Sequence, residues 1–221
     1  MKLGTILTCG ILASFTLAFG GDEIVLERIP DEDEAASIAR TLVARESLAN
    51  INTFTSIPGR TGPIPVSLME YYADCDNDGD PYWLVVDIGS TNRNIARGSS
   101  FSWTIRVGDH PRNDDVDPNY PGAIPSSPAG SPRINLVGRL ENVTFSNPRE
   151  LIKLERCFVA RHPDAKYWLP YNPITPHNSH WTKFVVEEIY MVGGFGDRAY
   201  IGTIDSKKYH QASTLPNEMK Y

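Results

Sequence analysis

The chain has little cysteine, few basic residues relative to acids, and no long apolar run after its first 20 residues. Three cysteines among 221 residues exclude a small disulfide-rich scaffold. Lysine and arginine total 21 against 27 acids, for a formal net charge of −6. Because a phosphate backbone attracts basic surfaces, this balance argues against nucleic-acid binding. No later stretch is apolar enough over enough residues to cross a bilayer, so stable membrane insertion is not expected.

The sequence also lacks the common catalytic and metal-binding patterns. It has no nucleophile elbow, no phosphate-binding glycine loop and no paired-carboxylate signature. His177 and His180 stand three apart in a proline-rich loop, and a polar loop explains them better than zinc. Asp74–Gly79 begins like a calcium loop, but Val85 occupies the twelfth position, where glutamate is required. We therefore predict no metal site and no catalytic residue.

Residues 1–20 have the features of a secretory signal peptide. Lys2 precedes the mostly apolar stretch Ile6–Phe19, and Ala18 and Gly20 are small residues at the positions a signal peptidase reads. A membrane anchor is the alternative. Removal takes away one base and no acid, so the mature net charge becomes −7. We expect a protein that is secreted or held in an endolysosomal or vacuolar lumen, beginning with an extension over residues 21–30.

Two modifications are compatible with that route. An oxidising compartment permits a bond between Cys75 and Cys157, although two separate buried thiols are the alternative because Cys157 lies in an apolar helical pattern. Asn142-Val143-Thr144 is a glycosylation sequon. Strict alternation from Ile134 puts Asn142 on the inward face of its strand. Attachment of a glycan at Asn142 therefore requires the strand to end or bulge there.

Residues 31–215 read as one domain with more strands than helices. Asp31 and Asn147 are expected to cap two helices, the second of which ends at His162-Pro163. Residues 108–132 form a proline-rich loop within the domain, and 216–221 a short C-terminal tail. Strands are predicted over residues 49–57, 66–75, 82–88, 101–107, 134–145, 181–192 and 200–204. The predicted fold class is mainly β, a β-barrel with flanking helices.

Short motifs in order along the chain point to a family. They are Ala35-Ala36, Ile38-Ala39-Arg40, Pro81-Tyr82-Trp83-Leu84, Gly138, Arg161-His162-Pro163, Trp168, Trp181, Lys183-Phe184, Ile189-Tyr190, the glycines 193, 194 and 196, Ile204 and Tyr209. With these the chain resembles the CREG family, the secreted cellular-repressor glycoproteins, within the FMN-binding split-barrel superfamily of pyridoxamine 5′-phosphate oxidase-like proteins. The resemblance implies a split barrel, a homodimer formed across sheet faces, and a branch whose flavin cleft is filled by protein.

A flavin site can still be sought among the residues. In the superfamily, the segment after the strand matching Tyr82–Ile88 holds the FMN phosphate. Here Ser90 and Thr91 could donate hydrogen bonds and Arg93 could supply charge, with Arg60 as a further cation. The alternative, which we favour, is an ordinary turn capped by Ser90 or Thr91.

The leading expectation is a non-enzymatic glycoprotein that needs no cofactor and acts as a homodimer; no receptor can be named. An FMN-dependent oxidoreductase is the alternative, and a small-molecule binder that uses the same cleft without turnover is a third possibility. The 108–132 loop is expected to cover the cleft or to rim the dimer.

Overall fold

The computed structural model describes residues 28–216. The predicted signal peptide, most of the N-terminal extension and nearly all of the C-terminal tail lie outside these residues. Among the described residues, no helix is long and apolar enough to cross a membrane.

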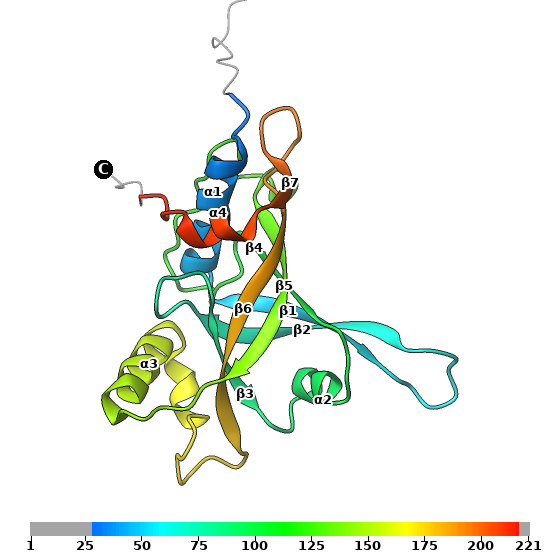
Figure 1. The fold of residues 1–221 in the computed structure, drawn as a ribbon, viewed down its shortest axis with the longest axis vertical. Coiled ribbons are helices and arrows are strands. Elements are labelled where there is room, and N and C mark those ends of the chain that lie inside the picture. The colour runs from blue at the N-terminus through cyan, green and yellow to red at the C-terminus, as the bar shows by residue number, and fades with distance from the viewer. Residues whose placement is uncertain (1–27, 217–221) are drawn as a thin grey trace, which may run out of the picture.

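Six antiparallel strands close into a barrel, and a seventh extends its sheet (Figure 1). Pairing between β3 and β6 completes the closure. The strand order is β3 (Tyr82–Val86), β2 (Ile64–Ala73), β1 (Leu48–Thr55), β4 (Ser102–Arg106), β5 (Arg133–Asn142), β6 (Ser179–Val192) and β7 (Ile201–Ile204). The prediction of a β-barrel with flanking helices is confirmed.

Four helices lie outside the barrel. They are α1 (Glu32–Arg45), α2 (Ser90–Ala96), α3 (Pro148–Arg161) and α4 (Ser206–Gln211), with 3₁₀ turns at Pro128–Gly130 and Pro163–Tyr167. Asp31 caps α1 and Glu34 completes its capping box, as the sequence predicted. Figure 1 shows α1 and α4 together at one end of the barrel, with α2 and α3 at the other. The sequence did not predict α4.

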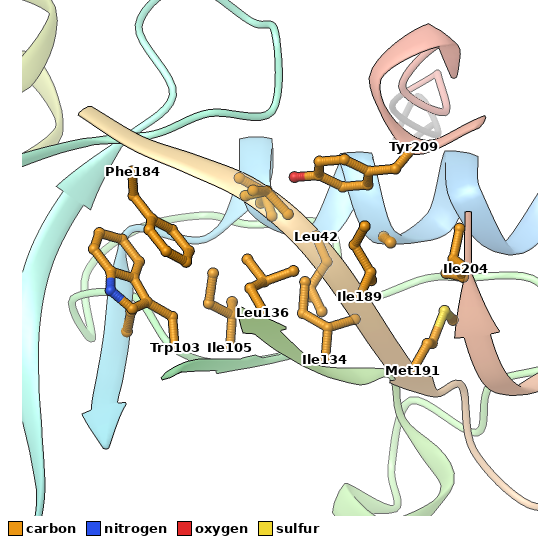
Figure 2. Packing of buried hydrophobic residues seen from close by; sticks show 14 of the residues in the cluster. Leu42, Trp103, Ile105, Ile134, Leu136, Phe184, Ile189, Met191, Ile204 and Tyr209 are labelled. Atoms are coloured by element: carbon orange, nitrogen blue, oxygen red, sulfur yellow. The ribbon is translucent and has the colours of Figure 1, made fainter. Parts of the chain in front are cut away.

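The main core fills the barrel and extends under α1 and α4. Trp103 stacks on Phe184 with ring centroids 4.4 Å apart, and Leu42 of α1 packs over the interior (Figure 2). The buried Tyr209 of α4 donates a hydrogen bond of 2.8 Å from its hydroxyl to the carbonyl of Gly79. Both terminal helices therefore seal one end of the barrel.

The barrel opens between β2 and β3. These strands pair at only two positions, Tyr72 with Trp83 and Ala73 with Tyr82. The rest of β2 pairs only with β1, and this β1–β2 hairpin projects from the barrel (Figure 1). Beyond these two pairs, β2 and β3 diverge.

A second apolar cluster holds α3 against the outside of the barrel. Leu154 and Phe158 of α3 pack with Leu84 and with other residues of β2 and β6. A disulfide joins Cys75 to Cys157, with Cα atoms 5.9 Å apart, so the alternative of two separate thiols does not describe this structure. The bond links α3 covalently to the segment between β2 and β3.

The proline-rich loop packs against α1 and the β6–β7 turn. Tyr120 is buried in the main core, and the guanidinium of Arg45 lies 5.0 Å from its ring centroid. Gly122 has a positive φ and so little space that a Cβ would collide with the carbonyl of Arg198. The loop therefore lies at the α1 end of the barrel.

Strand ends differ from the predictions by a few residues. β3 stops at Val86 rather than residue 88 because a tight turn begins there, in which Gly89 donates to the Val86 carbonyl. β5 has a register shift between Val137 and Gly138 and ends at Asn142, whose side chain is exposed. The strand end that a glycan at Asn142 requires is thus present.

Candidate functional site

The segment after β3 forms a turn and then α2. Gly89 occupies the N-cap position, and no side chain makes a capping hydrogen bond there. The prediction that Ser90 or Thr91 caps the helix is therefore wrong. The reason is a shift in the helix start, since both residues already lie inside the first turn of α2.

Thr91 faces the barrel, and its hydroxyl is hydrogen-bonded to a carboxylate. Its buried hydroxyl donates a hydrogen bond of 2.5 Å to Glu70 Oε1 on β2. Burial raises the pKa of Glu70, and the hydrogen bond from Thr91 offsets part of this effect. A phosphate placed at Thr91 would compete for the hydroxyl and would meet a neighbouring acid.

Arg93 lies on the opposite face of α2 from Thr91. Asn94 also faces the barrel, where its side-chain amide donates to Thr53 Oγ1 at 3.0 Å. At about 100° per residue, Arg93 projects away from Thr91 and Asn94, and it is exposed, as is Ser90. Arg60 is exposed in the hairpin turn. Thr91 and Arg93 therefore project from different faces of α2. The assignment of Ser90, Thr91 and Arg93 to an FMN phosphate stays a prediction.

A groove lies where β2 and β3 diverge. Its volume is about 280 Å³, and its lining is mainly apolar. The residues that line it are Met69, Glu70, Tyr71, Leu84, Val86, Phe158 and Trp168. No residue of the 108–132 loop lines this groove; the expectation that the loop covers the cleft or rims the dimer stays a prediction. Sequence reasoning missed the groove because Phe158 and Trp168 come from α3 and the following 3₁₀ turn, far along the chain.

His162 supports the groove as part of the scaffold. Its ring stacks on Tyr71 with centroids 4.3 Å apart, and its Nε2 lies 2.9 Å from the Tyr72 carbonyl. Burial lowers the pKa of His162, which favours the neutral ring donating from Nε2. As predicted, α3 ends at this residue, so His162 fixes the end of a helix.

A lysine side chain neutralises acidic residues of the calcium-like loop Asp74–Gly79. Lys183 on β6 lies 3.0 Å from Asp76 Oδ2 and 2.6 Å from Asp78 Oδ2. These two carboxylates raise the pKa of Lys183, outweighing the opposing effect of burial. Asp74 instead accepts hydrogen bonds from the backbone of Asp78 and Gly79. Across residues 28–216, no group of three or more histidine, cysteine or acidic residues could hold a metal ion.

The outer face of the sheet carries a row of uncharged residues. Each member is the direct cross-strand partner of the next, from β2 through β1, β4, β5 and β6 to β7. The row consists of Met69, Asn50, Thr104, Asn135, Tyr190 and Thr203. Its largest members, Met69 and Tyr190, are 52% and 50% exposed. We call this set the neutral row.

Two amides beside and within the neutral row are satisfied by neighbouring hydroxyls. Asn52 and Asn135 each donate to Ser102 Oγ and Thr104 Oγ1, at distances between 2.9 and 3.3 Å. These contacts hold the side chains flat against β1, β4 and β5. No sequence pattern indicates this network, because its members are polar residues that alternate with the core in separate strands.

Comparisons with known proteins agree with the fold. A profile of the family described as CREG, beta-barrel matches residues 30–211. No curated protein matches the chain significantly. A heme binding protein from Mycobacterium smegmatis superposes with a TM-score of 0.58 at 22% identity over 84% of this chain, which spans 62% of that protein.

Two further solved structures resemble the chain. One has a TM-score of 0.54 at 19% identity, covering 82% of this chain and 99% of its own. A candidate pyridoxamine 5′-phosphate oxidase from Listeria innocua has a TM-score of 0.42 at 13% identity, covering 74% of this chain and 98% of its own, which is too low to support an inference. With a family match over most of its length and a split-barrel fold, this chain belongs to the CREG β-barrel family.

Proposed function

We propose that this chain is a secreted or endolysosomal glycoprotein that acts as a homodimer through protein contacts and catalyses no reaction. The neutral row is the observation that carries the proposal. The row crosses six strands without a charge, on a protein with 27 acids and 21 bases. The centres of protein interfaces are depleted in charge and enriched in residues such as tyrosine and methionine.

The row suits contact with a second copy of itself. The hydrogen bonds of Asn52 and Asn135 to Ser102 and Thr104 mean that burying these amides leaves few unsatisfied donors. A two-fold axis through the face would bring Met69 and Tyr190 of each protomer against the partner's sheet, since such interfaces use one patch twice. The neutral row would then be covered on both protomers.

Sedimentation velocity at micromolar concentration tests the dimer. We expect the wild-type protein to sediment as a dimer, with twice the mass of one chain. Tyr190→Arg should weaken dimerisation at least tenfold, which corresponds to about 1.4 kcal/mol, because two charges enter the interface. Tyr171→Arg, at a position 92% exposed in another part of the molecule, is the matched control. A monomeric wild type, or equal dimerisation of both variants, would refute the proposal.

The groove between β2 and β3 favours a second candidate, an FMN-dependent oxidoreductase. It is apolar, and the fold resembles that of a heme binding protein. The hydrogen bond that Thr91 donates to Glu70 argues against this candidate, because it occupies a hydroxyl that the FMN phosphate would need. In the leading proposal the groove binds no cofactor.

Visible absorbance separates the two candidates. Protein purified from a secretory host should be colourless and should not take up added FMN or heme. A stoichiometric chromophore would contradict the non-catalytic proposal. If FMN does bind, Arg93→Ala should weaken it, whereas an unchanged affinity would remove Arg93 from the phosphate site.

A further inference from the structure

Two segments of this acidic chain contain no acid. Residues 50–69 and 88–108 hold none of the 27 aspartates and glutamates, yet they carry Arg60, Arg93, Arg97 and Arg106. The first segment is the β1–β2 hairpin and the second comprises α2 and β4. The charge of the protein is therefore divided unevenly, with a basic region set in an acidic molecule.

The two segments form one region of the structure. Asn94 of α2 donates to Thr53 Oγ1 on β1 at 3.0 Å, and the Phe54 backbone donates to Ser99 Oγ at 2.7 Å. Figure 1 shows α2 beside the base of the projecting hairpin. These contacts hold α2 and the residues that follow it against the β1–β2 hairpin, whereas Arg106 lies at the other end of β4, beside Asp109.

Three of these arginines have no partner in the part of the chain that the structure describes. Arg60, Arg93 and Arg97 are exposed and make no side-chain hydrogen bond or ion pair there, whereas Arg106 pairs with Asp109 at 2.9 Å. Arg93 and Arg97 are four residues apart and share the face of α2 opposite the buried Thr91. Their charges are thus available to an external partner.

Exposed aliphatic side chains accompany these arginines. Ile57 in the hairpin turn, Leu68 on β2 and Ile88 before α2 are 40%, 39% and 55% exposed. Leu68 pairs with the core residue Ile51, so its side chain lies on the α2 side of the hairpin, opposite the neutral row. We call Ile57, Arg60, Leu68, Ile88, Arg93 and Arg97 the arginine surface.

We propose that the arginine surface docks peripherally on a membrane that contains anionic lipids. Arginines meet acidic headgroups while neighbouring aliphatic side chains reach the acyl boundary, the combination used by interfacial membrane-binding segments. The acidic remainder of the protein is repelled by the same lipids, which orients the molecule with its hairpin toward the bilayer. Leu68 of this surface lies on the opposite side of the hairpin from Met69 of the neutral row, so the docking proposal does not rest on the proposed homodimer.

Vesicle co-sedimentation at low ionic strength tests the docking. We expect the purified protein to bind vesicles of equimolar phosphatidylcholine and phosphatidylserine, and not phosphatidylcholine alone. The triple variant Arg60→Ser, Arg93→Ser, Arg97→Ser should lose at least tenfold in affinity. The matched control is Arg112→Ser, Arg149→Ser, Arg156→Ser, which removes three exposed arginines from elsewhere with the same change in net charge. Equal binding by the two triple variants would overturn the proposal.

Two further measurements identify which part of the vesicle the protein recognises. Ile57→Ser should weaken binding without changing its dependence on salt, because it removes an apolar contact and no charge. Soluble glycerophosphoserine at millimolar concentration should not displace the protein from vesicles. Displacement by this headgroup alone would mean that the arginines bind a small phosphate ligand, and it would overturn docking on a lipid surface. Circular dichroism of every variant confirms that loss of binding is not loss of fold.

Discussion

At the scale of single residues, the contact between Thr91 and Glu70 determines what the α2 turn can bind. A hydroxyl that the sequence offers to a phosphate is instead held by a carboxylate 2.5 Å away. No sequence pattern indicates this pair, because Glu70 lies 21 residues earlier on a strand whose register against α2 is set by the whole barrel. Residue types were thus predictable at this site, but the partner of Thr91 was not.

Replacing Glu70 should change how stability depends on pH. Burial raises the pKa of Glu70 above its ordinary value of 4.5, so the folded state holds the proton more tightly than the unfolded chain. The stability that this group contributes is therefore fully present below pH 4.5 and is lost as pH rises through the folded pKa. A difference of one pH unit between the folded and unfolded pKa values corresponds to about 1.4 kcal/mol. Glu70→Gln should lack this loss, as measured by urea unfolding across acidic and neutral pH.

The control for Glu70 is Glu188→Gln, at an exposed position on β6. Its unfolding free energy should follow the wild type at every pH. Other buried carboxylates with raised pKa values, including Glu46 and Asp74, contribute equally to both proteins and cancel in the comparison. A difference between wild type and Glu70→Gln that stays constant with pH would contradict the assignment.

At the scale of elements, α3 is an accessory helix fastened to a barrel that closes without it. Its packing relies on a small cluster around Leu154 and Phe158 and on the disulfide from Cys157. The helix itself was predictable from Asn147, Pro148 and the apolar spacing that follows. Its place on the outside of β2 and β3 was not, because it depends on contacts between distant segments.

Removing the disulfide should loosen α3 first. The bond closes a loop between residues 82 apart in the sequence, which in the chain-entropy description stabilises the fold by about 4.5 kcal/mol. Cys75→Ser combined with Cys157→Ser should lower the unfolding free energy by a comparable amount. Hydrogen exchange should accelerate in residues 148–161 before it does in β5 and β6. Uniform acceleration through the barrel would contradict a local role.

Elements with a periodic pattern of apolar residues were predictable from the sequence, whereas an element that forms only through packing was not. Strands β4 and β6 were predictable because apolar and polar residues alternate along them or because they are long and aromatic-rich. Helix α4 has the sequence SKKYHQ, in which Tyr209 is the single large apolar residue. Six residues with one buried side chain produce no helical periodicity, and the helix forms because Tyr209 is inserted into the core.

At the scale of the whole molecule, the exposed end of β5 makes Asn142 a glycan acceptor if the chain enters the secretory route. We expect the full chain expressed in a eukaryotic host to be recovered from the lumen or medium with its N-terminus near Gly21. Peptide N-glycosidase should increase its mobility on a gel, and Asn142→Gln should abolish that shift. Asn113→Gln, an exposed asparagine outside any sequon, should keep it. A shift that persists in Asn142→Gln would contradict the assignment.

The contact between the first and last helices determines when the domain can complete its folding during synthesis. Tyr209 of α4 lies beneath the Arg40 guanidinium of α1, 5.6 Å from its ring centroid, and bonds to Gly79 in the β2–β3 turn. A ribosome must therefore have released almost the entire domain before that end of the barrel can be sealed. Until then, the emerging chain exposes apolar surface from α1 and β1, and it should depend on chaperones throughout synthesis.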